Sequence, residues 1–136
     1  SKEGTEETRA LFSSSGGNVH TIKIGEHDRL MSVVLGMSHA LSIAFFNALA
    51  NSGLSREELE RASSTTFRHQ ECTSRRVAME NPELYYERQH VNPHTREALD
   101  LLVRSIEEIR QAAMAEEGEE FERLMEHGRN YYGGRE

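Results

Sequence analysis

The chain has 136 residues, of which 29% are charged, and its net charge is −7. This length corresponds to about one domain, and the acidic balance argues against a nucleic-acid partner, because phosphate binding needs a concentrated basic surface. The single cysteine, Cys72, allows no internal disulfide, which favours a reducing and therefore cytoplasmic location.

The first part of the chain predicts a short helix followed by a strand. Residues 5–12 have a helical pattern that ends at Ser-Ser-Ser-Gly-Gly, and residues 19–24 alternate as a strand does. A lone strand leaves its backbone groups without partners. Residues 1–25 are therefore expected to be the last helix and strand of an α/β domain whose remainder is absent from this chain.

Residues 26–52 predict a long helix that is almost free of charge after Arg29. Its apolar run, residues 30–46, is short for a bilayer span and is interrupted by polar residues, so no membrane partner is expected. A helix that is apolar around most of its circumference is covered on more than one side. It is expected to be the central helix of a helical domain or to be shared with a second subunit.

The rest of the chain predicts further helices, separated by local start and stop signals. Ser55 and Glu58 form a capping box, and Asn-Pro pairs at 81–82 and 92–93 restart the chain. The hydroxyl run at 63–66 predicts a loop with a helix cap at Thr65 or Thr66. The expected helices are residues 55–62, 67–79, 82–91, a long amphipathic helix that begins at Pro93, and 117–131. The fold class is therefore mainly α.

Two polar features lie where a solvated surface is not the obvious explanation. His39 lies in the apolar run, where it is either a core histidine bonded to a backbone group or to the hydroxyl of Ser38 or Ser42, or a residue that faces a ligand. The adjacent Arg75 and Arg76 point about 100° apart on a helix, so one can face solvent while the other turns inward. An inward arginine needs an acid, which is either a protein carboxylate or a ligand.

No metal or cofactor signature stands out. His90 and His94 have the spacing of a helical zinc pair, but Asn92-Pro93 breaks the helix between them, so no metal site is expected. Cys72 has no CxxC companion, and no glycine-rich dinucleotide or phosphate-binding turn is present.

Five separated motifs resemble one family when they are read in chain order. They are Glu-His-Asp-Arg-Leu-Met at 26–31, Ser-His-Ala at 38–40, Glu-Arg-Ala-Ser-Ser-Thr-Thr-Phe-Arg at 60–68, Arg-Val-Ala at 76–78 and Glu-Asn-Pro-Glu-Leu-Tyr-Tyr at 80–86. This order is similar to the C-terminal helical dimerisation domain of prephenate dehydrogenases, especially archaeal-type members. The similarity extends over about residues 16–110.

The resemblance implies an NAD(P)-dependent oxidative decarboxylation of prephenate to 4-hydroxyphenylpyruvate, a step of tyrosine biosynthesis. In that family an N-terminal Rossmann domain binds NAD or NADP and carries the catalytic histidine. Residues 1–25 would then be the end of the Rossmann domain and residues 26–136 the helical domain. The chain would form a homodimer and would hold no catalytic or cofactor-binding residue of its own.

The resemblance also implies roles for residues of the substrate pocket. Arg76 matches the arginine that binds a carboxylate of prephenate, and His39 matches a histidine that faces the ring side of the substrate. Ser38 is expected to add a hydroxyl, and Tyr85 to reach toward the neighbouring subunit's site. The helical pattern alone also allows an alternative, a non-catalytic dimerisation or ligand-sensing module.

Overall fold

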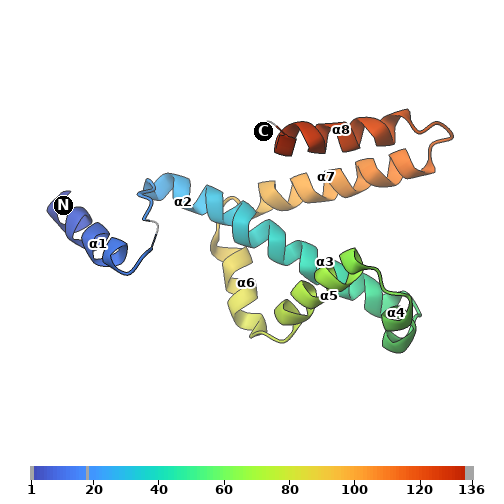
Figure 1. The fold of residues 1–136 in the computed structure, drawn as a ribbon, viewed down its shortest axis with the longest axis horizontal. Coiled ribbons are helices and arrows are strands. Elements are labelled where there is room, and N and C mark those ends of the chain that lie inside the picture. The colour runs from blue at the N-terminus through green and yellow to red at the C-terminus, as the bar shows by residue number, and fades with distance from the viewer. Residues whose placement is uncertain (1, 18, 134–136) are drawn as a thin grey trace.

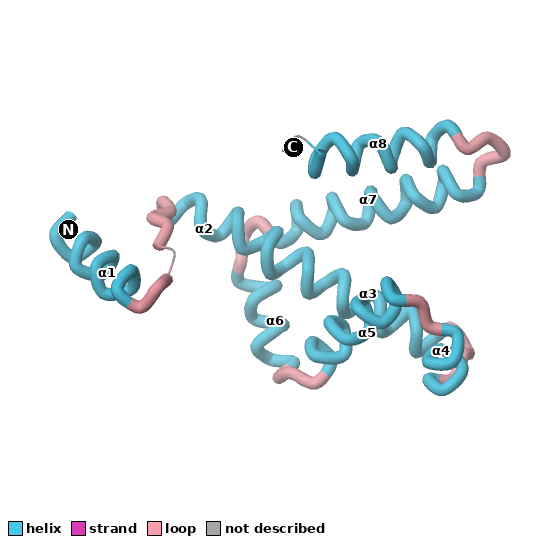
Figure 2. Tube along the Cα trace, viewed as in Figure 1, coloured by secondary structure: helices cyan, strands magenta, loops and turns pink. Residues whose placement is uncertain are grey.

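Helices dominate the computed structural model, which describes residues 2–17 and 19–133 (Figures 1 and 2). They are α1 (Lys2–Ser14), α2 (Ile24–Met31), the π-helix η1 (Ser32–Met37), α3 (Ser38–Asn51), α4 (Arg56–Ala62), α5 (Thr65–Ala78), α6 (Pro82–Val91), α7 (Thr95–Met114) and α8 (Glu119–Gly133). Within the described residues there is no β-strand. The predicted mainly α fold class is confirmed.

The predicted strand at residues 19–24 is wrong. Residues 19–23 have no regular secondary structure, and Ile24 already begins α2. Lys23 keeps an extended backbone, with φ −66° and ψ 141°, but it serves as the residue before the helix. An alternating pattern becomes a strand only when a neighbouring strand satisfies its backbone groups, and the described part of the chain offers none. The structure therefore gives no support to a helix-strand remnant of a Rossmann domain.

The central element is one continuous helical segment, residues 24–51, made of α2, η1 and α3 (Figure 1). Helix α5 packs on α3, while α6 and α7 pack on η1. Helix α8 folds back on α7, so that the α7–α8 hairpin and the α4–α5 region form two arms on the central segment (Figure 1). This matches the predicted role of residues 26–52 as the central helix.

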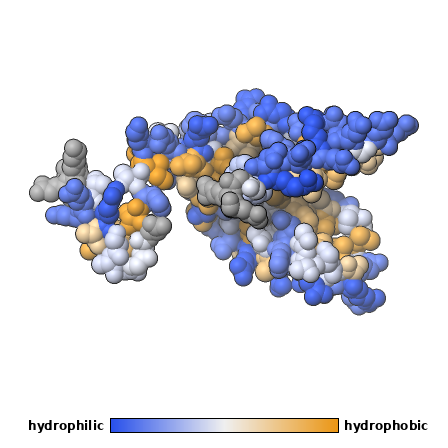
Figure 3. Space-filling view, turned by 45° about the horizontal axis from the view of Figure 1, so that its top comes forward, coloured by the Kyte–Doolittle hydropathy of each residue, from blue (hydrophilic) through white to orange (hydrophobic). Residues whose placement is uncertain are grey.

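The residues buried where these helices meet are small. They are Ser32, Gly36, Ser42, Ser74, Thr95, Ala98 and Ala112. Many large apolar side chains remain exposed, and Figure 3 shows apolar side chains gathering through the middle of the molecule between hydrophilic edges. On the central segment these include Leu30, Val33, Val34 and Leu41, which we call the exposed stripe. Such a surface on a helical domain is typical of a subunit interface.

The central segment is also long and apolar enough to cross a bilayer. Residues 24–51 contain a window of mean hydropathy 1.7, of which 11% is buried within the subunit. The helix is longer than the apolar run considered above, so its length does not exclude a membrane. The core helix of a soluble protein, like a membrane span, can have this length and composition.

Local capping signals account for most helix starts. Ser55 and Glu58 form the predicted capping box before α4, and Asn81 caps α6 with Pro82 in its first turn. Helix α5 is capped by Ser64, whose hydroxyl accepts a bond from the backbone N–H of Phe67 at 3.1 Å, so the cap predicted at Thr65 or Thr66 is wrong by one or two residues.

Candidate functional site

Two side chains, one on helix α6 and one on the residue that follows it, donate hydrogen bonds to backbone carbonyls of the central segment. Gln89 donates from Nε2 to the carbonyl of Gly36 at 2.8 Å, and Asn92 donates from Nδ2 to the carbonyl of Asp28 at 2.7 Å. Gly36 is buried and belongs to η1. Single π-helical turns are frequent at functional sites, and this one ends two residues before His39.

His39 lies against an aromatic ring of α6. The ring centroids of His39 and Tyr85 are 4.6 Å apart and their planes are tilted by 50°. The guanidinium carbon of Arg88 lies 5.9 Å from the centroid of the Tyr85 ring, at cation–π distance. Burial of the imidazole, and then the positive charge of Arg88, lower the pKa of His39 below its ordinary value. His39 is therefore neutral at pH 7, with one ring nitrogen as donor and the other as acceptor.

Two buried polar atoms of this cluster have no hydrogen-bond partner among the described residues. They are Nδ1 of His39 and Oε1 of Gln89. Of the alternatives considered for His39, a bond between Nδ1 and a backbone group or a neighbouring hydroxyl is absent, and the hydroxyl of Ser38 donates to the carbonyl of Val34 at 2.7 Å. Buried polar atoms are normally satisfied, so a water molecule or a polar ligand atom fits here.

A small apolar pocket lies beside the cluster. It has a volume of about 380 Å³, and Tyr85 and Gln89 form part of its wall. The remaining lining residues are Ile43, Phe46, Val77, Ala78, Glu80, Pro82 and Tyr86. A pocket of this size with few polar groups suits a small ring-shaped ligand.

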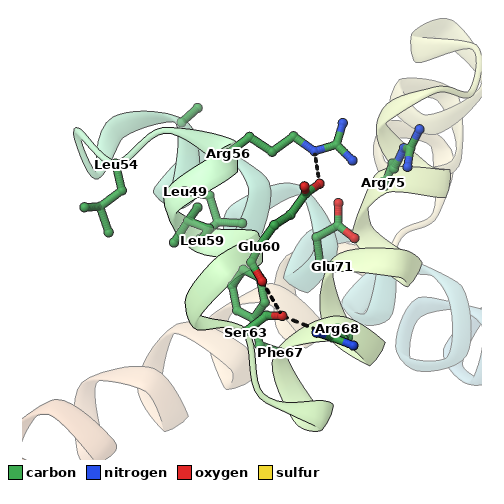
Figure 4. Close-up of a pocket in the computed structure, with 11 residues that line it drawn as sticks. Leu49, Leu54, Arg56, Leu59, Glu60, Ser63, Phe67, Arg68, Glu71 and Arg75 are labelled. Atoms are coloured by element: carbon green, nitrogen blue, oxygen red, sulfur yellow. Dashed lines mark hydrogen bonds and ion pairs between the residues drawn. The ribbon is translucent and has the colours of Figure 1, made fainter.

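The two adjacent arginines of α5 are both exposed. Ser74 is the most deeply buried residue of the chain, with 1% exposure, and Arg76 lies two positions later, roughly 200° around the helix. Arg76 therefore points away from α3 within one subunit, and no described contact joins it to His39. Arg75 instead lines a pocket of about 630 Å³ between α3, α4 and α5 (Figure 4).

The glycine turn after α1 does not fit a dinucleotide. Gly16 has φ +80°, and the N–H of Gly17 bonds to the carbonyl of Phe12 at 3.2 Å, so the turn caps the end of a helix. Dinucleotide phosphates bind to free N–H groups at the start of a helix. The described residues also contain no group of three or more His, Cys, Asp or Glu side chains placed to bind a metal.

Arg88 and Gln89 are site residues that were not predicted from the sequence. Both follow Tyr85 on α6, by three and four positions, and therefore share its helix face. That spacing is the signal that could have identified them once Tyr85 was a candidate.

The family described as "Prephenate dehydrogenase, dimerization domain" matches residues 23–127. The chain belongs to this family. That assignment confirms the resemblance drawn from the five motifs, and it agrees with the large apolar surface that one subunit leaves exposed.

A relative from Methanocaldococcus jannaschii is described as "Probable arogenate/prephenate dehydrogenase". It is 25% identical over 123 residues, which cover 90% of this chain and 28% of the relative. The chain thus spans little more than a quarter of the length of that relative. No solved structure matches the chain.

Proposed function

We propose that this chain is the part of an arogenate/prephenate dehydrogenase that forms the dimer and completes the substrate-binding site. The reaction is the oxidative decarboxylation of prephenate to 4-hydroxyphenylpyruvate, which leads to tyrosine. The family match supports this proposal, and so does a neutral, half-buried His39 with an unpartnered Nδ1 beside an apolar pocket.

The residues of the cluster suit the ring of such a substrate. A neutral imidazole can bond to a hydroxyl on the ring as donor or acceptor without adding a charge to the pocket. The apolar wall beside Tyr85 accommodates the ring itself. Ser38, one position before His39, keeps two lone pairs on its oxygen, although its proton is used within the helix.

Arg76 supplies a positive charge that can bind a carboxylate of the substrate. Prephenate carries two carboxylates, and a guanidinium binds a carboxylate through two parallel bonds. The exposed side chain of Arg76 makes no hydrogen bond or ion pair to any described residue, and it projects away from α3. We therefore propose that the substrate site is complete only in the assembled protein. There, another domain or subunit would hold the substrate between Arg76 and the residues of that domain or subunit.

The redox chemistry belongs to a second domain in this proposal. NAD or NADP accepts the hydride and is bound by a Rossmann domain that precedes residue 26, because the glycine turn after α1 has its N–H groups occupied. The catalytic histidine lies on that domain. The free, exposed Cys72 agrees with a cytoplasmic location.

The chain acts as a homodimer in the same proposal. The family is a dimerization domain, and the exposed stripe offers the central segment as a contact surface. In one subunit Tyr85 lies against His39 of the same chain, and its predicted reach toward the neighbouring site remains part of the proposal.

The test is Arg76→Ala in the protein that carries both domains, with Arg75→Ala as the matched control. Removing one partner of a buried charged pair costs about 2 to 5 kcal/mol, which is roughly 30-fold or more in affinity. Because the contact exists in ground and transition states alike, the KM for prephenate should rise at least tenfold, with the cofactor KM unchanged.

Arg75→Ala should leave both constants near those of the parent protein. If Arg75→Ala is instead the damaging change, the assignment of Arg76 fails. A two-domain protein that turns over neither prephenate nor arogenate would favour the non-catalytic dimerisation or ligand-sensing module.

A further inference from the structure

A second pocket lies far from His39. It is formed where α3 ends and α4 and α5 begin, and it has a volume of about 630 Å³. Leu49 in its wall lies ten residues beyond His39 on the same helix, which is about 15 Å along the axis. A ligand in this pocket would therefore not occupy the proposed prephenate site.

One end of the pocket is apolar. Leu49, Leu54 and Leu59 gather at one end of the view in Figure 4, and Phe67 also lines the pocket. The Phe67 ring is held by Phe45 of α3, with centroids 6.0 Å apart. This wall offers a place for an aliphatic or aromatic side chain.

The other end carries charged groups of both signs, and only some of them have partners. Arg56 bonds to Glu60 at 2.9 Å, and Nε of Arg68 donates to the hydroxyl of Ser63 at 2.8 Å, which leaves the two terminal nitrogens of Arg68 available (Figure 4). These two bonds orient the side chains of Arg56 and Arg68 at the mouth of the pocket.

Glu71 and Arg75 lie one turn apart on α5, and the side chain of neither makes a hydrogen bond or ion pair to any described residue. Glu71 is half-buried and Arg75 exposed, and both line the pocket. A half-buried carboxylate without a partner favours a cation, and an unpaired guanidinium favours a carboxylate. The pocket thus presents an unpaired carboxylate, Glu71, and an unpaired guanidinium, Arg75, next to an apolar wall.

We propose that this pocket binds a free α-amino acid with an apolar or aromatic side chain. Arg75, with Arg68, binds the carboxylate, Glu71 binds the ammonium group, and the leucine and phenylalanine wall takes the side chain. A simple carboxylate would leave Glu71 unpaired, and a simple amine would leave Arg75 unpaired. The proposal does not depend on the proposed function, since it concerns different residues.

The experiment is an NMR titration of the 136-residue chain with L-phenylalanine, compared with 3-phenylpropionate and 2-phenylethylamine. For a ligand of this size we expect a dissociation constant of about 1 mM. Each analogue lacks one charged group and should bind about tenfold or more weakly. The shifted resonances should belong to residues around Phe67 and Leu59 rather than to His39 or Tyr85.

Three variants complete the test. Arg75→Gln and Glu71→Gln should each weaken L-phenylalanine binding about tenfold or more, while Arg76→Gln, the adjacent arginine on the other side of α5, should bind as the parent does. If Glu71→Gln fails to fold, Arg75→Gln and the two analogues still decide the question. Equal binding of all three ligands, equal effects of Arg75→Gln and Arg76→Gln, or no binding because a second copy fills the pocket would overturn the proposal.

Discussion

The exposed stripe provides the sharpest test of dimerisation. We expect Val34→Asp to convert the proposed homodimer into a folded monomer. Val34 is 57% exposed in one subunit, so the folded subunit should tolerate a polar residue there with little loss of stability. In a dimer the same position would be covered by the partner.

The magnitude follows from the area that remains to be buried. Complete burial of a valine side chain contributes about 1.5 to 3 kcal/mol, and a little over half of Val34 is left to bury at the interface. Counted for both subunits, the loss is about 2 to 3 kcal/mol, or at least roughly 30-fold in the dissociation constant. The new carboxylates add a desolvation cost in the same direction.

Sedimentation equilibrium over a range of micromolar concentrations measures this constant, with circular dichroism as the check on folding. Leu11→Asp, on α1 and outside the matched part of the chain, is the control, because Leu11 is also largely exposed but does not belong to the stripe. A parent chain that is a well-folded monomer at these concentrations would refute the reasoning. So would a Val34→Asp protein that dimerises as tightly as the parent.

Three further predictions concern the cluster and the cofactor. Because the pKa of His39 is lowered by folding, the unfolded chain takes up a proton below about pH 6.5 that the folded chain resists, so stability should fall between pH 7 and pH 5. Urea denaturation should show a smaller fall for His39→Gln, and an equal fall would contradict the assignment. Gln89→Leu should lower the free energy of unfolding in urea by about 1 kcal/mol, since it removes the hydrogen bond from Nε2 of Gln89 to the carbonyl of Gly36. The control Gln111→Leu, on the exposed surface of α7, should change stability by less than about 0.5 kcal/mol, and an equal loss for both would remove the special role of Gln89. Calorimetric titration of the chain with NAD and with NADP should give no micromolar binding, and a micromolar constant would mean that the chain contains a phosphate-binding turn after all.

Local bonds explain why much of the fold could be predicted from the sequence. The capping box of Ser55 and Glu58 closes within four residues, and Asn81 with Pro82 starts α6 in the same local way. The apolar character of the central segment likewise indicated that its neighbours, or a second subunit, must cover it. The strand prediction failed because an alternating pattern has no local bond that could hold it.

The sequence alone determined the helices, the apolar central segment and the family motifs, because each depends on residues close together in the chain. Only the tertiary structure decided which partners the functional side chains have. The bond from Gln89 to Gly36 joins residues 53 positions apart, and the contact of His39 with Tyr85 depends on the same placement of α6. Likewise, the register of α5 on α3 decides that Arg75 lines the pocket and that Arg76 projects away from α3, although the two are neighbours in the chain. Long-range packing fixes that register, and no local pattern specifies it.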